Sequence, residues 1–291
     1  MNKIDIQILL YFSSDDLMKL LKSIQVLEAT KYQVHFHFMD QSEDTKEFAK
    51  VNEMVKQAKK EIGKNIEITM DKQPNYGFGK GHNEVYRKNK DSYGDSFIIL
   101  NPDTIIHHNL IDNIVKYLEY LKNENWGLLE LTQFPSEHPK YFDPQTLETN
   151  WASGAGTVIN SKAFEKVGMF DENIFMYGED VDLSIRMRMN KFKILHLPKA
   201  QFTHLTKDTD VSKQSDFTRI SKLAAELYLR YKYAKEEDVE QYINLIGEND
   251  PQRKDILKKF QEMKKKLDKR TYYKDFLNSE NQDYTNFRWT L

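Results

Sequence analysis

The sequence predicts an α/β fold, in which a mostly parallel central sheet is flanked by helices and followed by a helical C-terminal extension. Up to about residue 205, short segments rich in β-forming residues alternate with segments of helical spacing, the pattern of parallel α/β sheets. From about Leu205 onward Lys, Glu, Tyr and Leu dominate, with helical periodicity and little strand signal. We therefore expect an α/β domain over residues 1–205 and a helical extension over residues 206–291.

The bulk composition excludes several classes of protein. Of the 291 residues, 39% are hydrophobic and 30% charged, which is typical of a globular chain with a sizeable core. The formal charge of −2 gives no general attraction to nucleic acid, and the absence of cysteine excludes disulfides, thiolate nucleophiles and cysteine zinc sites. The N-terminus lacks signal-peptide features, and no apolar run reaches the ~18–20 residues of a membrane span. We expect a cytoplasmic protein that contacts a membrane only peripherally, if at all.

The first part of the chain reads as three strands separated by two helices. We predict strands over residues 4–12, 34–40 and 66–70, the second of which ends at Asp40. Ser13 and the three residues after it can cap a helix with apolar positions spaced from Leu17 to Leu27, and a second helix is expected over residues 45–62.

The next part repeats the alternation and ends in an irregular segment. A glycine-containing loop over residues 72–81 leads into a helix that carries Asn83 and Arg87. An apolar strand over residues 97–100 stops at Asn101-Pro102-Asp103, and a helix over 110–121 and a strand over 127–131 follow. Residues 132–150 contain three prolines and are predicted to form a mobile loop before a short apolar segment over 157–159.

An acidic helix start follows an aromatic-rich loop. Val181, Ile185 and Met189 recur every fourth residue and share one helix face, which places Glu179 and Asp180 at the helix N-terminus. Ionised acids are favoured there, so a capped surface helix is the simple interpretation.

Acidic residues on separate elements suggest a binding site. The predicted topology brings Asp40, Asp103 and the Glu179-Asp180 pair to one edge of the sheet, where parallel α/β proteins bind ligands. Clustered carboxylates repel one another unless a cation offsets them, and Mg²⁺ or Mn²⁺ favours carboxylate, phosphate oxygen and water. A metal with acids suggests a phosphate-bearing substrate, and an acid outside the metal site can serve as a general base. The residue types alone do not assign these roles.

A set of short motifs in a fixed order resembles a known family. Asp40-Gln41-Ser42, Asn75-Tyr76-Gly77-Phe78-Gly79, Asn101-Pro102-Asp103, Trp151-Ala152-Ser153-Gly154, Glu179-Asp180-Val181-Asp182 and a closing His204 occur in this order. Together they resemble family-two inverting glycosyltransferases of the Rossmann-like GT-A fold. Within that family they are most similar to the rhamnosyltransferase-like branch that builds bacterial surface polysaccharides. The resemblance spans roughly residues 4–205.

The resemblance implies a donor side for the site. Asp40 matches the acid that accepts a hydrogen bond from the uracil or thymine base, and Asn75, Gly77 and Gly79 match a loop near the donor nucleotide and sugar. Asn101 and Asp103 occupy the place of the Asp-x-Asp motif, with Asp103 the expected metal ligand. The first strand ends in Leu10-Tyr11-Phe12, where the family usually has Thr-Tyr-Asn.

The same resemblance implies a metal site, a base and an acceptor side. His204 matches the histidine that completes the site for Mn²⁺ or Mg²⁺. Asp180 matches the base that deprotonates the acceptor hydroxyl, and Glu179 and Trp151 match acceptor-binding positions. The implied reaction moves a sugar, with rhamnose from dTDP-rhamnose the leading donor, to a hydroxyl of a lipid-linked or growing surface glycan. The implied place is the cytoplasm or the inner face of the cell membrane.

Three alternatives stay open at this point. The donor can instead be UDP-glucose, UDP-galactose or a UDP-N-acetylhexosamine. The chain can be a nucleotide-sugar-binding scaffold without turnover, against which the retention of Asp103 and Asp180 argues. A nucleotidyltransferase would need a glycine-rich, lysine-bearing loop near the first strand, and residues 11–16 offer none.

Several conspicuous residues have simpler explanations. Arg186 lies four residues after Asp182, which predicts an ion pair on the helix surface, although the family register favours a brace for the acid cluster. His35 and His37 share one face of a strand and are assigned to the sheet surface with no function. The basic stretch over residues 251–270 is by default a solvated helix face. The alternative is contact with anionic lipid, helped by three aromatic residues just after it, Tyr272, Tyr273 and Phe276.

Overall fold

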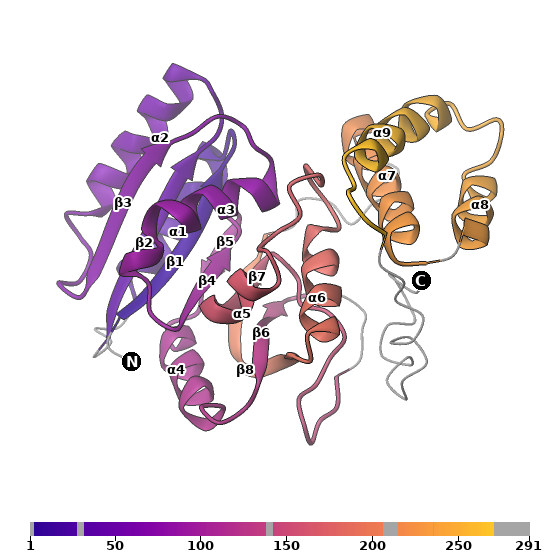
Figure 1. Ribbon diagram of the computed structural model, residues 1–291. Coiled ribbons are helices and arrows are strands. Elements are labelled where there is room, and N and C mark those ends of the chain that lie inside the picture. Colours follow the sequence, from indigo (N-terminus) through magenta and orange to yellow (C-terminus); the bar gives the residue numbers. More distant parts are fainter. Residues whose placement is uncertain (1–2, 28–31, 138–141, 206–214, 235, 271–291) are drawn as a thin grey trace.

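The computed structural model describes residues 3–27, 32–137, 142–205, 215–234 and 236–270 (Figure 1). Its centre is an eight-stranded sheet in the order β3-β2-β1-β4-β7-β6-β8-β5. The strands are β1 (Lys3–Leu10), β2 (Gln33–Asp40), β3 (Ile66–Lys72), β4 (Ser96–Leu100), β5 (Thr104–Ile106), β6 (Trp126–Phe134), β7 (Gly156–Asn160) and β8 (Lys193–His204).

The sheet is mixed, with parallel pairing at its N-terminal half. β3, β2, β1 and β4 run parallel to one another, and β6 runs parallel to β8. β7 is antiparallel to both of its neighbours, and β5 is antiparallel to β8. Parallel pairs are the majority, as predicted, and the carboxyl ends of β1, β2 and β4 meet at one edge.

Helices cover both faces of the sheet because its strands present alternate side chains to two cores. The helices are α1 (Ser14–Gln25), α2 (Thr45–Ala58), α3 (Phe78–Asn89), the 3₁₀ turn η1 (Lys90–Ser92), α4 (Leu110–Tyr120), α5 (Ser161–Lys166) and α6 (Glu179–Met189). One core joins α1, α2 and α4 to Ile98 and Leu100 of β4, and the other joins α3, α5 and α6 to Phe97 and Ile99 of the same strand. The predicted α/β architecture is confirmed.

The C-terminal helices form a lobe on the outer side of α6. These helices are α7 (Asp216–Tyr233), α8 (Glu236–Leu245) and α9 (Arg253–Lys265), and Figure 1 shows them side by side beyond α6. Val181 and Ile185 of α6 share one apolar core with Leu227 and Tyr228 of α7 and Phe260 of α9. The apolar stripe predicted on the acidic helix therefore packs against the C-terminal segment. The predicted boundary at residues 205 and 206 adjoins the segment 206–214, which lies outside the described residues.

Several element boundaries differ from the prediction, among them the predicted helix over 45–62, which ends at Ala58, and three of the differences have a clear local reason. β1 ends at Leu10, since Phe12 has a φ of 47° that a strand cannot continue. α3 begins at Phe78, inside the predicted loop, because Gly77 with a φ of 77° turns the chain into the helix. β6 continues to Phe134, since Thr132 to Phe134 pair with the last part of β8. Thr132 to Phe134 are thus strand rather than loop, and residues 138–141 lie outside the described residues.

Within the described residues, every helix is either too short or too polar to cross a lipid bilayer.

Candidate active site

A cavity of about 830 Å³ opens at the carboxyl ends of β1, β2 and β4. Its wall contains most of the residues predicted for the site: Asn75, Gly77, Asn101, Asp103, Trp151, Glu179, Asp180 and His204. These residues come from distant parts of the sequence, and the topology brings them to one hollow. Asp40 and Gly79 are not in the wall.

The expected metal ligands Asp103 and His204 face each other across the end of the sheet. β5 and β8 pair so that Thr104 lies opposite His204, and the backbone N–H of Leu205 donates to the carbonyl oxygen of Asp103 over 2.8 Å. The carboxylate Oδ1 of Asp103 lies 3.3 Å from Nε2 of His204. Both side chains are partly exposed to the cavity, with 28% and 12% of their surface accessible, so an ion can reach them.

Gln133 orients the histidine, and the sequence did not reveal it. Its Oε1 lies 2.9 Å from Nδ1 of His204, which fits a proton on Nδ1 and a lone pair on Nε2, the tautomer needed for a metal ligand. The Asn101 amide lies 3.5 Å from the same Nε2. Gln133 belongs to the extension of β6 that was predicted as loop, and only the inward-facing register of that strand could have pointed to it.

Asp180 is held at the first turn of α6 with its carboxylate in the cavity wall. Its Oδ1 accepts from the N–H of Val181 over 2.8 Å, and its Oδ2 accepts from the N–H of Gly154 over 3.0 Å. These two backbone donors fix the direction of the carboxylate at the start of the helix.

Glu179 is buried beside Asp180 and differs from it in environment. Its side chain is 6% exposed, and its Oε2 atom has no hydrogen-bond partner among the described residues. Burial, reinforced by the negative charge of Asp180, raises the pKa of the Glu179 carboxyl well above its usual range. Glu179 therefore favours the neutral form.

The loop that carries Asn75 and Gly77 is locked against the loop before α6. Asn75 Oδ1 accepts from the N–H of Gly77 over 3.1 Å, and the N–H of Phe78 donates to the carbonyl oxygen of Phe175 over 2.9 Å. A Cβ atom on Gly77 would lie 2.0 Å from that oxygen. Only glycine fits this contact, so the loop is part of the cavity framework.

Asp40 and Gly79 support the wall from behind. Asp40 is 2% exposed, accepts from the hydroxyl of Ser42 over 2.8 Å, and has a pKa raised by burial. Its neighbour Gln41 does line the cavity, and Gln41 Oε1 accepts a hydrogen bond from the N–H of Tyr76 over 3.3 Å. A Cβ on Gly79 would lie 3.0 Å from Phe170 Cβ, so this glycine permits close packing of α3 beneath the site.

The opposite wall is aromatic and includes residues of the C-terminal helices. Trp151 is 5% exposed and belongs both to this wall and to the core shared with α7. Phe217 and Lys222 of α7 also line the cavity, and Lys222 Nζ lies 5.1 Å from the ring centre of Tyr177. The sequence assigned no site residue to this segment, because no local motif marks it.

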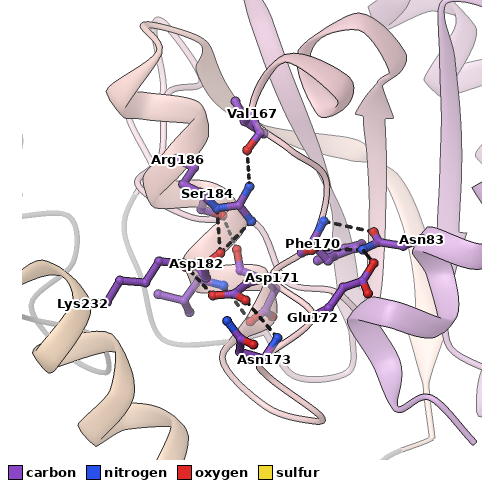
Figure 2. A network of polar contacts seen from close by, with 12 residues as sticks. Asn83, Val167, Phe170, Asp171, Glu172, Asn173, Asp182, Ser184, Arg186 and Lys232 are labelled. Atoms are coloured by element: carbon purple, nitrogen blue, oxygen red, sulfur yellow. Dashed lines mark hydrogen bonds and ion pairs between the residues drawn. The ribbon is translucent and has the colours of Figure 1, made fainter. Parts of the chain in front are cut away.

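A buried ionic network fixes α6 from below (Figure 2). Asp182 is fully buried and accepts hydrogen bonds from Arg186 Nε over 2.8 Å, from Lys232 Nζ over 2.6 Å and from the Tyr233 hydroxyl over 2.7 Å. Lys232 also binds Asp171 over 2.6 Å. Burial alone would raise the pKa of Asp182, but Arg186 and Lys232 outweigh it and lower that pKa to about 2. The predicted ion pair between Arg186 and Asp182 forms, but its predicted position on the helix surface is wrong, since α7 covers this side of α6. The network braces the acidic helix start.

The basic stretch over residues 251–270 is partly engaged inside the protein. Arg253 donates to the carbonyl oxygen of Ile243, Lys259 to the hydroxyl of Ser221, and Arg270 to the carbonyl oxygen of Tyr231. The predicted solvated face therefore holds for only part of the stretch. The three aromatic residues predicted to help a lipid contact lie outside the described residues.

Comparisons with known proteins add sequence relatives and structural neighbours. No protein-family profile matches the chain. Rhamnosyltransferase WbbL of Escherichia coli is 24% identical over 166 residues, 44% of this chain and 61% of that protein. The N-acetylglucosaminyl-diphospho-decaprenol L-rhamnosyltransferase of Mycobacterium tuberculosis is 37% identical over 62 residues, 21% of this chain and 20% of that protein. The chain thus spans less than two thirds of these relatives.

Solved glycosyltransferase structures share the fold. The mannosyltransferase PcManGT from Pyrobaculum calidifontis, in complex with GDP-Man and Mn²⁺, has a TM-score of 0.58 at 13% identity and covers 88% of this chain and 74% of its own. S. aureus TarS in complex with UDP-GlcNAc has a TM-score of 0.55 at 12% identity and covers 95% of this chain and 75% of its own. The predicted GT-A fold and the resemblance to rhamnosyltransferase-like glycosyltransferases are confirmed.

Proposed function

We propose that this chain is a glycosyltransferase that moves a sugar from a nucleoside-diphosphate donor to a hydroxyl of a cell-surface polysaccharide precursor. The observation that carries the proposal is the convergence of Asp103, His204 and Asp180 on one cavity from three separate elements. The names of the sequence relatives, which are rhamnosyltransferases, and the nucleotide sugars bound by the structural neighbours support the same activity.

We propose Asp103 and His204 as the protein ligands of Mn²⁺ or Mg²⁺. The donor set fits: a carboxylate oxygen and an imidazole nitrogen lie 3.3 Å apart, and Gln133 holds the ring with the nitrogen lone pair toward the carboxylate. Two protein ligands leave coordination positions for diphosphate oxygens and water. When bound, such an ion neutralises charge on the departing nucleoside diphosphate.

In the proposed reaction Asp180 accepts the proton of the acceptor hydroxyl as the oxygen attacks the anomeric carbon. Attack from the face opposite the departing diphosphate inverts the configuration at that carbon. The N–H groups of Gly154 and Val181 fix the direction of the Asp180 carboxylate. Glu179, which favours the neutral form, lies beside Asp180 in the same wall and is proposed to help position the acceptor.

The aromatic wall formed by Trp151, Tyr177 and Phe217 is proposed to bind the acceptor sugar, whose apolar face stacks on such rings. The donor side is then the wall with Asn75, Gly77 and Asn101, and Asp40 immediately precedes Gln41 of this wall. dTDP-rhamnose is the leading donor, because the curated relatives are rhamnosyltransferases.

A second donor class is a UDP-hexose or UDP-N-acetylhexosamine, and one neighbour of the same fold binds UDP-GlcNAc.

A contact of exposed basic side chains of α9 with anionic lipid would suit a lipid-linked acceptor and a place at the inner face of the membrane. Vesicles with and without anionic lipid, sedimented with the protein, test this contact.

The activity is tested by a donor panel. Thermal unfolding is measured with dTDP-rhamnose, UDP-glucose and UDP-N-acetylglucosamine, each with Mn²⁺ and with a chelator. The proposal expects the midpoint to rise for one nucleotide sugar, and to rise more with Mn²⁺. A chain that responds to none of the nucleotide sugars, under either condition, is not a glycosyltransferase of this kind.

A further inference from the structure

The sheet face opposite α1 and α2 carries a polar cluster on β1, β2 and β3, away from the proposed active site. Register places Asp5 beside His35, and His35 beside Glu67, in one row across the three strands. The next row on that face places Gln7 beside His37 and His37 beside Thr69. Asp5 lies toward the opposite end of β1 from the cavity, since it precedes Leu10 by five residues, roughly 16 Å along a strand.

Two imidazoles converge on one buried carboxylate in this cluster. Oδ1 of Asp5 lies 2.9 Å from Nε2 of His37 and 3.8 Å from Nδ1 of His35. Asp5 is fully buried, and its second oxygen, Oδ2, has no hydrogen-bond partner among the described residues. A buried carboxylate oxygen without a partner is costly, so a group that binds it would stabilise the fold.

The outer nitrogens of both rings meet the same hydroxyl. Nε2 of His35 lies 3.2 Å and Nδ1 of His37 lies 3.5 Å from Oγ1 of Thr69. A hydroxyl oxygen has two lone pairs and can accept from both rings when each carries its proton on the outer nitrogen. The inner nitrogens, which face Asp5, then both present lone pairs. This is the arrangement in which protein histidines bind metals, with the second nitrogen donating to a fixed acceptor.

We propose that Asp5, His35 and His37 form a second metal site, for Zn²⁺ or a similar transition ion, distinct from the Mn²⁺ or Mg²⁺ site of the active centre. One ligand atom from each of the three residues lies within 4.8 Å of the others. In a tetrahedral zinc site with bonds of about 2.0–2.1 Å, neighbouring ligand atoms are about 3.3 Å apart. The distances of 2.9 and 3.8 Å bracket this value, so small side-chain rotations complete the site.

The ligand set selects the ion. Two imidazoles with a carboxylate suit zinc, whereas Mg²⁺ requires mostly oxygen ligands. Glu67, whose Oε2 lies 3.8 Å from Nδ1 of His35 and which is 70% exposed, or a water, supplies the fourth ligand. Since Asp5, His35 and Glu67 come from three adjacent strands, the ion would tie β1, β2 and β3 together.

Lys3 competes with the ion for Asp5. Its Nζ lies 2.9 Å from Oδ1 of Asp5, and the Lys3 side chain is 37% exposed. The ammonium therefore contacts the same oxygen that faces both imidazoles, and it must move aside when an ion binds that oxygen. The alternative explanation is that Lys3 and His37 alone satisfy the carboxylate, and this explanation predicts no specific zinc binding.

The test uses the full chain with Asp103→Ala, which removes a proposed ligand of the active-site metal. The protein is stripped with chelator, dialysed and titrated with Zn²⁺ against a chromophoric chelator. One Zn²⁺ per chain is expected to bind. In the same background His35→Gln and His37→Gln should each weaken binding at least about tenfold, and Lys3→Gln should strengthen it. Mg²⁺ should not compete.

Two further measurements keep the result decisive. Far-UV circular dichroism and the thermal midpoint of metal-free His35→Gln, whose ring is 13% exposed, report whether this variant folds like its parent. X-ray absorption at the zinc edge of the Asp103→Ala protein itself counts ligands and needs no further variant. Two imidazoles bound to the zinc support the proposal. No stoichiometric binding, binding unchanged in both histidine variants, or fewer than two imidazoles at the metal would overturn it.

Discussion

Substitution of Lys232 in α7 tests how the C-terminal helices support the site. Its ammonium lies 2.6 Å from Asp171 and 2.6 Å from Asp182, and these two side chains are 10% and 0% exposed. Lys232→Met keeps much of the side-chain volume but removes the charge between two buried carboxylates. Breaking a buried ion pair from one side costs about 3–5 kcal/mol, because the remaining charge is left without its partner.

The pKa of Asp182 gives an independent estimate of the same order. A value of about 2 in the folded protein against the ordinary 3.8 corresponds to a net stabilisation of about 2 kcal/mol, in which Arg186 and Lys232 outweigh the cost of burial. This contribution is fully present above pH 3.8 and is lost as the pH falls toward 2. Lys232→Met should therefore destabilise the protein at neutral pH and much less at pH 2.

Urea unfolding at pH 7 measures the effect, with Lys258→Met as the matched control, since Lys258 is exposed on the nearby α9. We expect the control to change the free energy of unfolding by less than about 0.5 kcal/mol. A double-mutant cycle with Asp171→Asn isolates the ion pair from packing, with an expected coupling of about 0.5–3 kcal/mol. If Lys232→Met behaves like its control, the network does not brace α6 and the reasoning from burial is refuted.

Three further predictions concern the cavity. Asp103→Ala should weaken the binding of a nucleoside diphosphate at least about tenfold when Mn²⁺ is present and should have little effect when a chelator is present. Titration calorimetry measures both affinities. An equal loss of affinity under the two conditions would argue against Asp103 as a metal ligand. Gly77→Ala should lower the free energy of unfolding by at least about 1–2 kcal/mol, since the φ of Gly77 is 77° and the new Cβ would meet a carbonyl oxygen. The control Gly63→Ala, at an exposed position with open space around it, should cause no such loss. Equal urea midpoints for the two variants would contradict this prediction. Burial lowers the pKa of His82 to about 3, so the unfolded chain binds the extra proton below pH 6.5 and stability falls as the pH drops. The loss between pH 7 and pH 5 should shrink by about 2 kcal/mol in His82→Gln, and an unchanged loss would show that His82 is not buried neutral.

Most strands and helices, and the approach of Asp103 to Asp180, were predictable because their signals are local, whereas β5, α5 and β8 were not predicted. The alternation of apolar residues in β2 and the four-residue spacing of Val181, Ile185 and Met189 in α6 follow directly from strand and helix periods. The convergence of Asp103 and Asp180 followed from the rule that ligands bind at the carboxyl ends of parallel strands.

The rest depended on contacts between residues far apart in the sequence. Gln133 meets His204 across 71 positions, through a strand extension that its polar sequence does not indicate. Asp182 was assigned to a helix surface, because the sequence of α6 does not indicate that α7 covers that side of the helix. Lys222 enters the cavity from a segment that contains no motif. Tertiary packing, rather than local propensity, placed each of these side chains.

The central claim is that Asp180 acts as the base in a cavity that binds a nucleoside-diphosphate sugar. Its most direct test compares the chain with Asp180→Asn, an isosteric change that keeps the acceptor oxygen for the Gly154 N–H. Release of nucleoside diphosphate from the donor identified by the panel is measured together with donor affinity. The account predicts that turnover falls at least about 10²-fold while donor affinity is unchanged. Turnover that survives the substitution, with the donor still bound, would contradict it.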